Sequence, residues 1–224
     1  MQLTIFSCSP QANAKSASAF ISEAFKIGFT SNHENTATIY FLRNRDQWRT
    51  YKDVFAKSEQ VLFVLPLYVD CIPGLLMEFL EYIEDWKQTE KASTNKKLSF
   101  ILQSGFPEAR QMRVCERFLE QLPSYLGCEY AGTLLKGGMF GAAYAMGEKS
   151  KTKVGNAYME FGKQFAKTAG FEKEAATVFA QPECFDQKTI RIMKLMMPLS
   201  RMVWNKLAKQ NGAVEKLSTK PYNV

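Results

Sequence analysis

The part of the chain best suited to chemistry is the stretch Pro66–Pro73, which reads PLYVDCIP. It follows an apolar run, Val61–Leu65, without alternation, and such a run is typical of a strand buried on both faces. Pro66 ends that strand because proline has no N–H to donate, so the stretch is a loop at the carboxyl end of a central strand. Open α/β sheets bind ligands at this end. Because the ring of Tyr68 lies between two stiffening prolines, we predict that the loop holds a planar cofactor.

A second stretch suited to a ligand is Ser7–Ser18, which follows the first apolar run. It matches neither the G-x-G-x-x-G dinucleotide pattern nor the G-x-x-x-x-G-K-[ST] phosphate loop. It still contains what one phosphate group needs. Ser9, Ser16 and Ser18 offer hydroxyls, Lys15 offers a positive charge, and a helix that starts at Ser16 offers unpaired N–H groups. Taken alone, a capped helix after a polar loop is the more common structure with this composition.

The fourth apolar run ends in a third such stretch, Gln103–Glu108. Gly105 lets a ligand approach the backbone, Ser104 can hydrogen-bond to a polar edge, and Phe106 can pack beside a ring. Taken alone, the stretch fits a tight turn, with Glu108 in the first turn of the next helix, equally well. The three stretches are more informative together, because they follow the first, third and fourth strands, which meet at one end of a 2-1-3-4-5 sheet.

The elements that must position these loops alternate between strand and helix patterns. Apolar runs predict strands at 3–7, 37–42, 61–65, 98–103 and 133–136. Apolar faces with helical spacing predict helices that begin near 16, 46, 75, 115 and 154, the first of them ended by Gly28 as a C-cap. This alternation is typical of a doubly wound α/β fold with a five-stranded parallel sheet. Periodicity leaves the strand order open, and 2-1-3-4-5 is one of two common solutions.

Two regions are expected, a domain over 1–170 and a C-terminal helical extension over 171–224. The extension is predicted to be a polar connection followed by helices at 190–197 and 199–209, with a break at Pro198. It also carries most of the net charge of +7, since eight Lys or Arg and two acidic residues from Asp186 onward give +6. The remaining +1 on residues 1–185 argues against a nucleic-acid-binding protein with a uniformly basic surface.

Composition excludes several classes of site. The five cysteines are scattered without a C-x-x-C pair, so no zinc site, iron–sulfur cluster or disulfide framework is expected. The one histidine, His33, lies in a polar run typical of a solvated loop, which excludes a histidine base or triad. Since there is no secretory signal and no apolar run of membrane-spanning length, we expect a reduced, cytoplasmic setting.

The three loops together resemble the flavin loops of the flavodoxin-like NAD(P)H-dependent FMN reductases and quinone reductases. The similarity spans residues 1 to about 170, and the second loop is the most specific of the three. The resemblance implies that the first loop binds the FMN phosphate through Ser9, Lys15, Ser16, Ala17 and Ser18. It implies that the isoalloxazine and ribityl chain lie against Pro66, Leu67, Tyr68, Val69 and Asp70. It implies that the pyrimidine edge of the ring contacts Ser104, Gly105 and Phe106.

This resemblance implies an FMN-dependent oxidoreductase that takes hydride from NADH or NADPH and passes electrons to a quinone, a flavin or another small acceptor. No catalytic side chain is expected, because the flavin performs the chemistry. One alternative is a flavodoxin-type electron carrier, although such carriers are acidic and this chain has a pI near 9.1. Another is a flavin-fold binding or regulatory protein without activity. That alternative rests on a departure at Gln11, where the family often has arginine, which also makes weaker FMN binding an expectation.

The extension leaves two hypotheses open. We expect it to be folded and packed on the domain or on a dimer mate, where it completes the substrate side of the site or an oligomer contact; the protein is therefore expected to be a homodimer. The alternative is a basic amphipathic segment on an anionic membrane, since Met-rich apolar positions alternate there with Lys and Arg. No nucleic-acid partner is expected.

Overall fold

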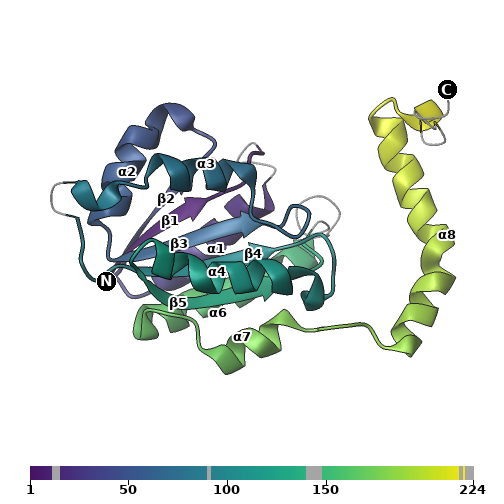
Figure 1. Cartoon of the computed structure of the whole chain (residues 1–224). Coiled ribbons are helices and arrows are strands. Elements are labelled where there is room, and N and C mark those ends of the chain that lie inside the picture. Colours follow the sequence, from purple (N-terminus) through teal and green to yellow (C-terminus); the bar gives the residue numbers. More distant parts are fainter. Residues whose placement is uncertain (12–15, 90–91, 140–147, 217–218, 220–224) are drawn as a thin grey trace. The chain divides into compact units, whose positions relative to one another are not determined.

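A computed structural model describes residues 1–11, 16–89, 92–139, 148–216 and 219. Its strands form one parallel five-stranded sheet in the order β2-β1-β3-β4-β5 (Figure 1). The strands are β1 (Gln2–Ser7), β2 (Thr36–Phe41), β3 (Gln60–Pro66), β4 (Lys97–Gln103) and β5 (Glu129–Lys136). This order confirms the predicted doubly wound, flavodoxin-like α/β fold.

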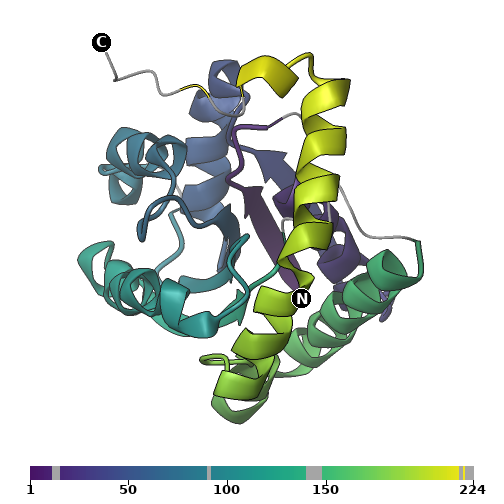
Figure 2. The same ribbon diagram turned by 90° about the vertical axis from the view of Figure 1, so that its right-hand side faces the viewer.

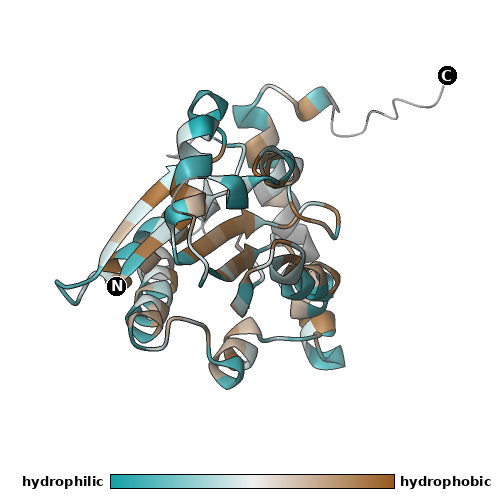
Figure 3. Cartoon of the chain, turned by 60° about the vertical axis from the view of Figure 1, so that its left-hand side comes forward, coloured by the Kyte–Doolittle hydropathy of each residue, from teal (hydrophilic) through white to brown (hydrophobic). Residues whose placement is uncertain are grey.

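Helices cover both faces of the sheet, as parallel sheets require. The helices that the structure describes are α1 (Ala17–Phe29), α2 (Trp48–Lys57), α3 (Gly74–Tyr82), α4 (Arg113–Tyr125), α6 (Glu148–Thr168), α7 (Lys173–Ala180) and, in a separate unit of the chain, α8 (Gln187–Gln210). The apolar sides of α2, α3 and α4 pack on one face, and those of α1 and α6 pack on the other. Figure 3 shows the apolar strands between these two layers. Among the described helices, none has the length and apolar character needed to cross a membrane.

A stack of aromatic rings runs across the sheet on the face covered by α2–α4. Phe6 on β1, Phe63 on β3 and Phe100 on β4 are ladder partners, and all three are fully buried. The ring centroids of Phe6 and Phe63 are 5.4 Å apart, those of Phe63 and Phe100 are 5.8 Å apart, and both pairs are stacked. Tyr130 on β5 extends the stack with a centroid 6.4 Å from Phe100. Such same-face neighbours stabilise one register against its alternatives.

The helices on the opposite face approach each other closely through two glycines. A Cβ atom on Gly28 of α1 would lie 1.8 Å from the carbonyl oxygen of Met159, and one on Gly162 of α6 would lie 2.2 Å from that of Phe25. The prediction that Gly28 is the C-cap of the first helix is therefore wrong. The helix continues to Phe29, and Gly28 is needed because α6 crosses at this point.

Other boundaries differ from the predictions by a few residues. The expected helix from 75 ends as α3 at Tyr82 and is followed by the short 3-10 turn Trp86–Gln88. The fifth strand begins at Glu129 rather than Thr133, because a register shift between Leu98 and Phe100 lets β5 pair with β4 beyond the irregularity.

The chain divides into two compact units, residues 1–184 and 185–224. The polar connection expected after 170 contains α7, which belongs to the first unit and packs against β5. Lys136 of β5 donates a hydrogen bond of 3.0 Å to the carbonyl oxygen of Phe179, whose ring lies 5.4 Å from that of Tyr158. This helix has only eight residues, so its packing on β5 is what stabilises it.

In the second unit, the expected break at Pro198 is wrong, because α8 spans 187–210 as one helix. Asp186 caps its start by accepting a 2.7 Å hydrogen bond from the N–H of Thr189. An internal proline removes one helical hydrogen bond, but the Leu-, Met-, Lys- and Arg-rich residues on both sides favour helix.

We predict that Phe63→Ala lowers the free energy of unfolding by about 3–5 kcal/mol, since it opens a cavity in the middle of the ring stack. Urea unfolding followed by circular dichroism measures this loss. Phe118→Ala is the matched control, because Phe118 lies on the outer side of α4 and is 43% exposed. Equal losses in the two variants would contradict a special role for the stack.

Candidate functional site

The three predicted loops lie together at the carboxyl ends of β1, β3 and β4, which Figure 2 turns toward the viewer. The N–H of Cys8 donates a 2.9 Å hydrogen bond to the carbonyl oxygen of Val64, which ties the exit of β1 to β3. The N–H of Leu67 donates a 2.8 Å bond to that of Gln103, which ties the exit of β3 to β4. As predicted, Pro66 is the last residue of its strand.

The first loop presents hydroxyl groups at the start of α1. Ser16 caps the helix by accepting a 3.3 Å hydrogen bond from the N–H of Ala19, and Ser9 accepts one of 3.2 Å from the N–H of Gln11. Ser18, beside Ala17 in the first turn, is fully buried, and its hydroxyl has no hydrogen-bond partner among the described residues. Lys15 lies outside the described residues.

An orphaned hydroxyl at a helix N-terminus fits an anionic group. The unpaired N–H groups of the first turn also favour an anion, and the partial positive charge at the start of the helix favours a phosphate there. The hydroxyls of Ser9 and Ser16 each accept from a backbone N–H, so their own protons remain available for donation. The first loop therefore fits the phosphate role that the sequence assigned to it.

The second loop contains a tight turn in a strained conformation. Tyr68 and Cys71 exchange two backbone hydrogen bonds of 3.1 Å, and the residues between them, Val69 and Asp70, have φ values of 48° and 63°. A β-branched residue at positive φ is an outlier that costs on the order of 1–3 kcal/mol. Burial does not offset this cost, since Val69 is 96% exposed. Strain of this kind is concentrated at ligand sites, and no residue type in the sequence announces it.

The third loop is held by the end of β5. Ser104 accepts a 3.1 Å hydrogen bond from the N–H of Phe106, and its carbonyl oxygen accepts one of 2.8 Å from Met139. A Cβ atom on Gly137 would lie 2.5 Å from the carbonyl oxygen of Phe106, so only glycine permits this close approach. Gly105 and Phe106 are exposed beside the exits of β3 and β4.

A cavity of about 310 Å³ adjoins the first two loops and contains residues that the sequence analysis missed. Pro10, Tyr68 and Pro73 line it together with two arginines from the segment after β2. Arg45 forms a 2.7 Å ion pair with Glu78, whereas Arg43 has no ion-pair partner among the described residues. The order of the strands brings these arginines here, because β2 lies beside β1. The sequence did contain one indication of this cavity, namely two arginines shortly after the second predicted strand.

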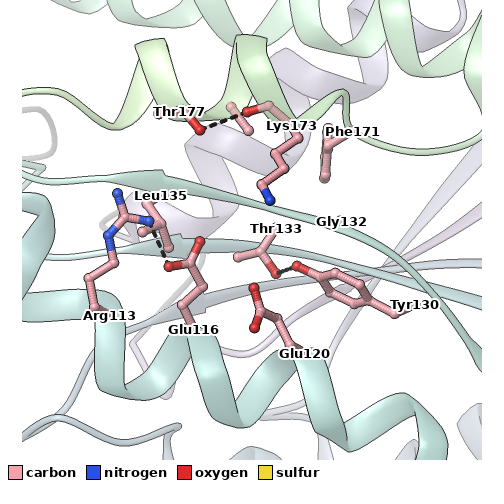
Figure 4. Close-up of a pocket in the computed structure, with 11 residues that line it drawn as sticks. Arg113, Glu116, Glu120, Tyr130, Gly132, Thr133, Leu135, Phe171, Lys173 and Thr177 are labelled. Atoms are coloured by element: carbon pink, nitrogen blue, oxygen red, sulfur yellow. Dashed lines mark hydrogen bonds and ion pairs between the residues drawn. The ribbon is translucent and has the colours of Figure 1, made fainter.

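A second cavity, of about 440 Å³, lies between α4, β5 and α7 (Figure 4). Arg113, which lines it, forms ion pairs of 2.6 Å with both Glu116 and Glu183. The hydroxyl of Tyr130 donates to Thr133, and burial raises the pKa of Tyr130 to about 12, so it stays protonated. Among the residues that the structure describes, no group of three or more His, Cys, Asp or Glu could hold a metal ion. We therefore assign no function to this cavity, which is a gap where α4, β5 and α7 pack together.

One buried titratable group lies at the opposite end of the sheet. Lys96, directly before β4, is 2% exposed, and its ammonium donates to the carbonyl oxygens of Phe55, Ala56 and Ser58 at the end of α2. It also lies 4.9 Å from the ring centroid of Trp86. Burial lowers the pKa of Lys96 to about 8. Because its donors are used on helix carbonyls, we assign it to the folding of α2 rather than to chemistry.

Comparisons with known proteins agree with this geometry. No protein-family model matches the chain, and no curated protein matches it. Several solved structures do match the fold of the chain. An NAD(P)H:quinone oxidoreductase from Methanothermobacter marburgensis superposes with a TM-score of 0.57 at 13% identity, over 77% of this chain and 97% of that one. The chain has the same fold as this oxidoreductase.

A second structure with this fold is an FMN-dependent NADH-azoreductase from Bacillus anthracis, in complex with FMN. It superposes with a TM-score of 0.55 at 15% identity, over 76% of this chain and 99% of that one. A putative quinone reductase from Klebsiella pneumoniae gives a TM-score of 0.57 at 10% identity, over 75% and 86% of the two chains. At such identities the likeness shows the fold alone, and the function must be argued from the loops.

We predict that Lys96 makes the free energy of unfolding rise with pH between about 8 and 10.5. In this window the unfolded chain keeps the proton until its ordinary pKa of 10.5, whereas the folded chain has released it, so the unfolded state binds more protons. The measurement is the difference in unfolding free energy between the wild type and Lys96→Met across that range. Lys57→Met, at an exposed position, is the control, and a flat difference for Lys96 would contradict the prediction.

Proposed function

We propose that this chain is an FMN-dependent oxidoreductase that takes hydride from NADH or NADPH and passes electrons to a quinone, a flavin or another small acceptor. The observation that carries the proposal is the buried hydroxyl of Ser18 at the start of α1, which has no hydrogen-bond partner among the described residues and lies at the same end of the sheet as the strained, ring-bearing turn at Tyr68. A phosphate fits the first feature and a planar ring fits the second. The activities for which the structural neighbours are named support the same chemistry.

The two ends of FMN would meet different loops. The phosphate would accept hydrogen bonds from Ser9, Ser16 and Ser18 and from the N–H groups near Ala17, with Lys15 as the candidate charge. The ring and ribityl chain would lie along the second loop, over Pro66, Leu67, Tyr68, Val69 and Asp70. The pyrimidine edge would meet Ser104, Gly105 and Phe106.

The side chains at this site would position the ring and shield it rather than transfer protons. Tyr68 and Phe106 are 44% and 63% exposed, so their rings are available to a flat ligand and would keep water from its faces. The N–H groups of the positive-φ turn and the hydroxyl of Ser104 are donors for its polar edges. When bound, FMN supplies the hydride and electron chemistry, and no titratable side chain is required.

The cavity with Arg43 and Arg45 would bind the phosphates of the nicotinamide dinucleotide. It adjoins Tyr68 and Pro10, and the start of α3 at Gly74 also lines it. Guanidinium groups recognise phosphates through paired, charge-assisted hydrogen bonds. The homodimer and the cytoplasmic location expected from the sequence stay predictions.

The decisive experiment is an absorbance spectrum of the purified protein after incubation with FMN and removal of free flavin. We expect bound flavin absorbance that is bleached by NADH or NADPH without oxygen and restored by a quinone. Bound flavin without bleaching would support the electron-carrier alternative. A protein that stays colourless would support a binding or regulatory role and defeat the proposal.

We predict that Ser18→Ala weakens FMN binding by about 10- to 100-fold, the range for one hydrogen bond to a charged group. Fluorescence titration of FMN measures the change. Ser22→Ala is the matched control, because this buried serine lies one turn further along α1 and donates to the carbonyl oxygen of Ser18. If both variants bind FMN as the wild type does, Ser18 does not contact the phosphate.

We predict that Arg43→Ala raises KM for NADPH by about tenfold and leaves kcat nearly unchanged, as expected for a contact that binds substrate and transition state equally. Steady-state kinetics with a fixed quinone concentration provide the measurement. Arg49→Ala, an exposed arginine at the start of α2, serves as the control. A fall in kcat at constant KM would contradict the assignment of Arg43 to dinucleotide binding.

A further inference from the structure

The C-terminal unit consists, in its described part, of the helix α8 and a short 3-10 turn, Val214–Lys216. The helix has 24 residues, which is about 36 Å of length at 1.5 Å per residue. Its last turn closes on the following residues, where the N–H of Ala213 donates a 2.8 Å hydrogen bond to the carbonyl oxygen of Ala208. This turn covers Ala208, but the described part of the unit contains no second layer that could cover the rest of the helix.

The described side chains of α8 separate into a basic stripe and a wide apolar face. At 100° per residue, the five described Lys and Arg side chains fall within about 120° of the circumference: Lys188, Arg191, Lys194, Lys206 and Lys209. Ile192, Met193 and Trp204 lie on the remaining circumference and are exposed, whereas Leu195 and Met202, also exposed, lie on the basic side. An apolar face of this width on a helix in water requires a partner.

The charge of α8 indicates the chemistry of that partner. All six ionisable residues within the helix are Lys or Arg, and residues 186–224 carry +6 in total. Residues 1–185 carry +1, so neither this domain nor that of a second copy offers a net negative complement. A partner with negative charges at its surface and an apolar layer below them would bind both the basic side and the apolar side of the helix.

We propose that α8 binds the surface of an anionic lipid bilayer, lying in the plane of the interface with its apolar face among the acyl chains. An amphipathic helix with a basic polar side and too little apolar character to cross the bilayer behaves in this way. Trp204 is a residue type enriched at the headgroup level, and the flexible methionines adapt to an irregular surface. Each Lys or Arg near the surface adds to the affinity for anionic lipid. This proposal is independent of the flavin site.

The intrinsic fluorescence of the full chain tests the proposal directly. Of the three tryptophans, Trp48 and Trp86 are 8% and 3% exposed, whereas Trp204 is 56% exposed. We therefore expect a blue shift from Trp204 on adding vesicles of equal phosphatidylcholine and phosphatidylglycerol, together with co-sedimentation. Both effects should be weak with phosphatidylcholine alone and should decrease at high salt.

Matched charge variants separate the helix from the overall charge of the protein. Arg191→Glu/Lys194→Glu/Lys209→Glu should weaken binding to the mixed vesicles by roughly 100-fold or more, since three attractive contacts are lost and reversed. The control changes the net charge equally on exposed positions of the domain: Arg49→Glu/Arg117→Glu/Lys153→Glu. It should keep most of the binding. Equal losses in both triple variants would overturn the proposal.

A variant with two apolar side chains of α8 replaced by asparagine distinguishes a membrane from a second copy of the chain as the partner of this face. Ile192→Asn/Met193→Asn keeps the charge and should also lose vesicle binding, while FMN binding and molar mass by light scattering stay as in the wild type. If instead the wild type ignores the vesicles and this variant converts a dimer to a monomer, the apolar face is an interface between copies and the membrane proposal is wrong.

Discussion

The structure depends on the register of its parallel sheet, which the stacked rings of Phe6, Phe63 and Phe100 hold from one face. Because side chains alternate between faces, a slip of one residue would move a ring to the wrong side of the sheet. The same register determines where the strands end. Pro66 and Gln103 are partners three residues beyond their phenylalanines, so the loops after β3 and β4 leave the sheet side by side.

The candidate site is organised by bonds within the loops rather than by titratable side chains. Ser9 and Ser104 each accept a hydrogen bond from a backbone N–H of their own loop and Ser16 accepts one from the first turn of α1, which orders the loops and leaves the hydroxyl protons free to donate. The turn at Val69 is held in its strained conformation by two backbone hydrogen bonds between Tyr68 and Cys71, one on each side of the turn. A cofactor that brings its own chemistry requires this kind of preorganised cradle.

Cations are used differently in the two units. In the domain, the ammonium of Lys96 satisfies the carbonyls at the end of α2, and the guanidinium of Arg113 joins α4 to Glu183. These charges stabilise the fold. In α8 the basic residues have no acidic neighbour within the helix, so their interaction energy remains available to a partner. This contrast separates the doubly wound domain from the helix that follows it in the chain.

The sequence alone determined the alternation of strands and helices and the position of the three loops, because apolar spacing and the missing N–H of proline act locally. Only the tertiary structure decided the rest. Gly28 matters because α6 crosses it, and Arg43 adjoins Tyr68 because β2 lies beside β1. The positive φ of Val69 was equally hidden, since nothing in a valine indicates a left-handed backbone. Each of these depends on contacts between segments far apart in the chain, which local propensity does not encode.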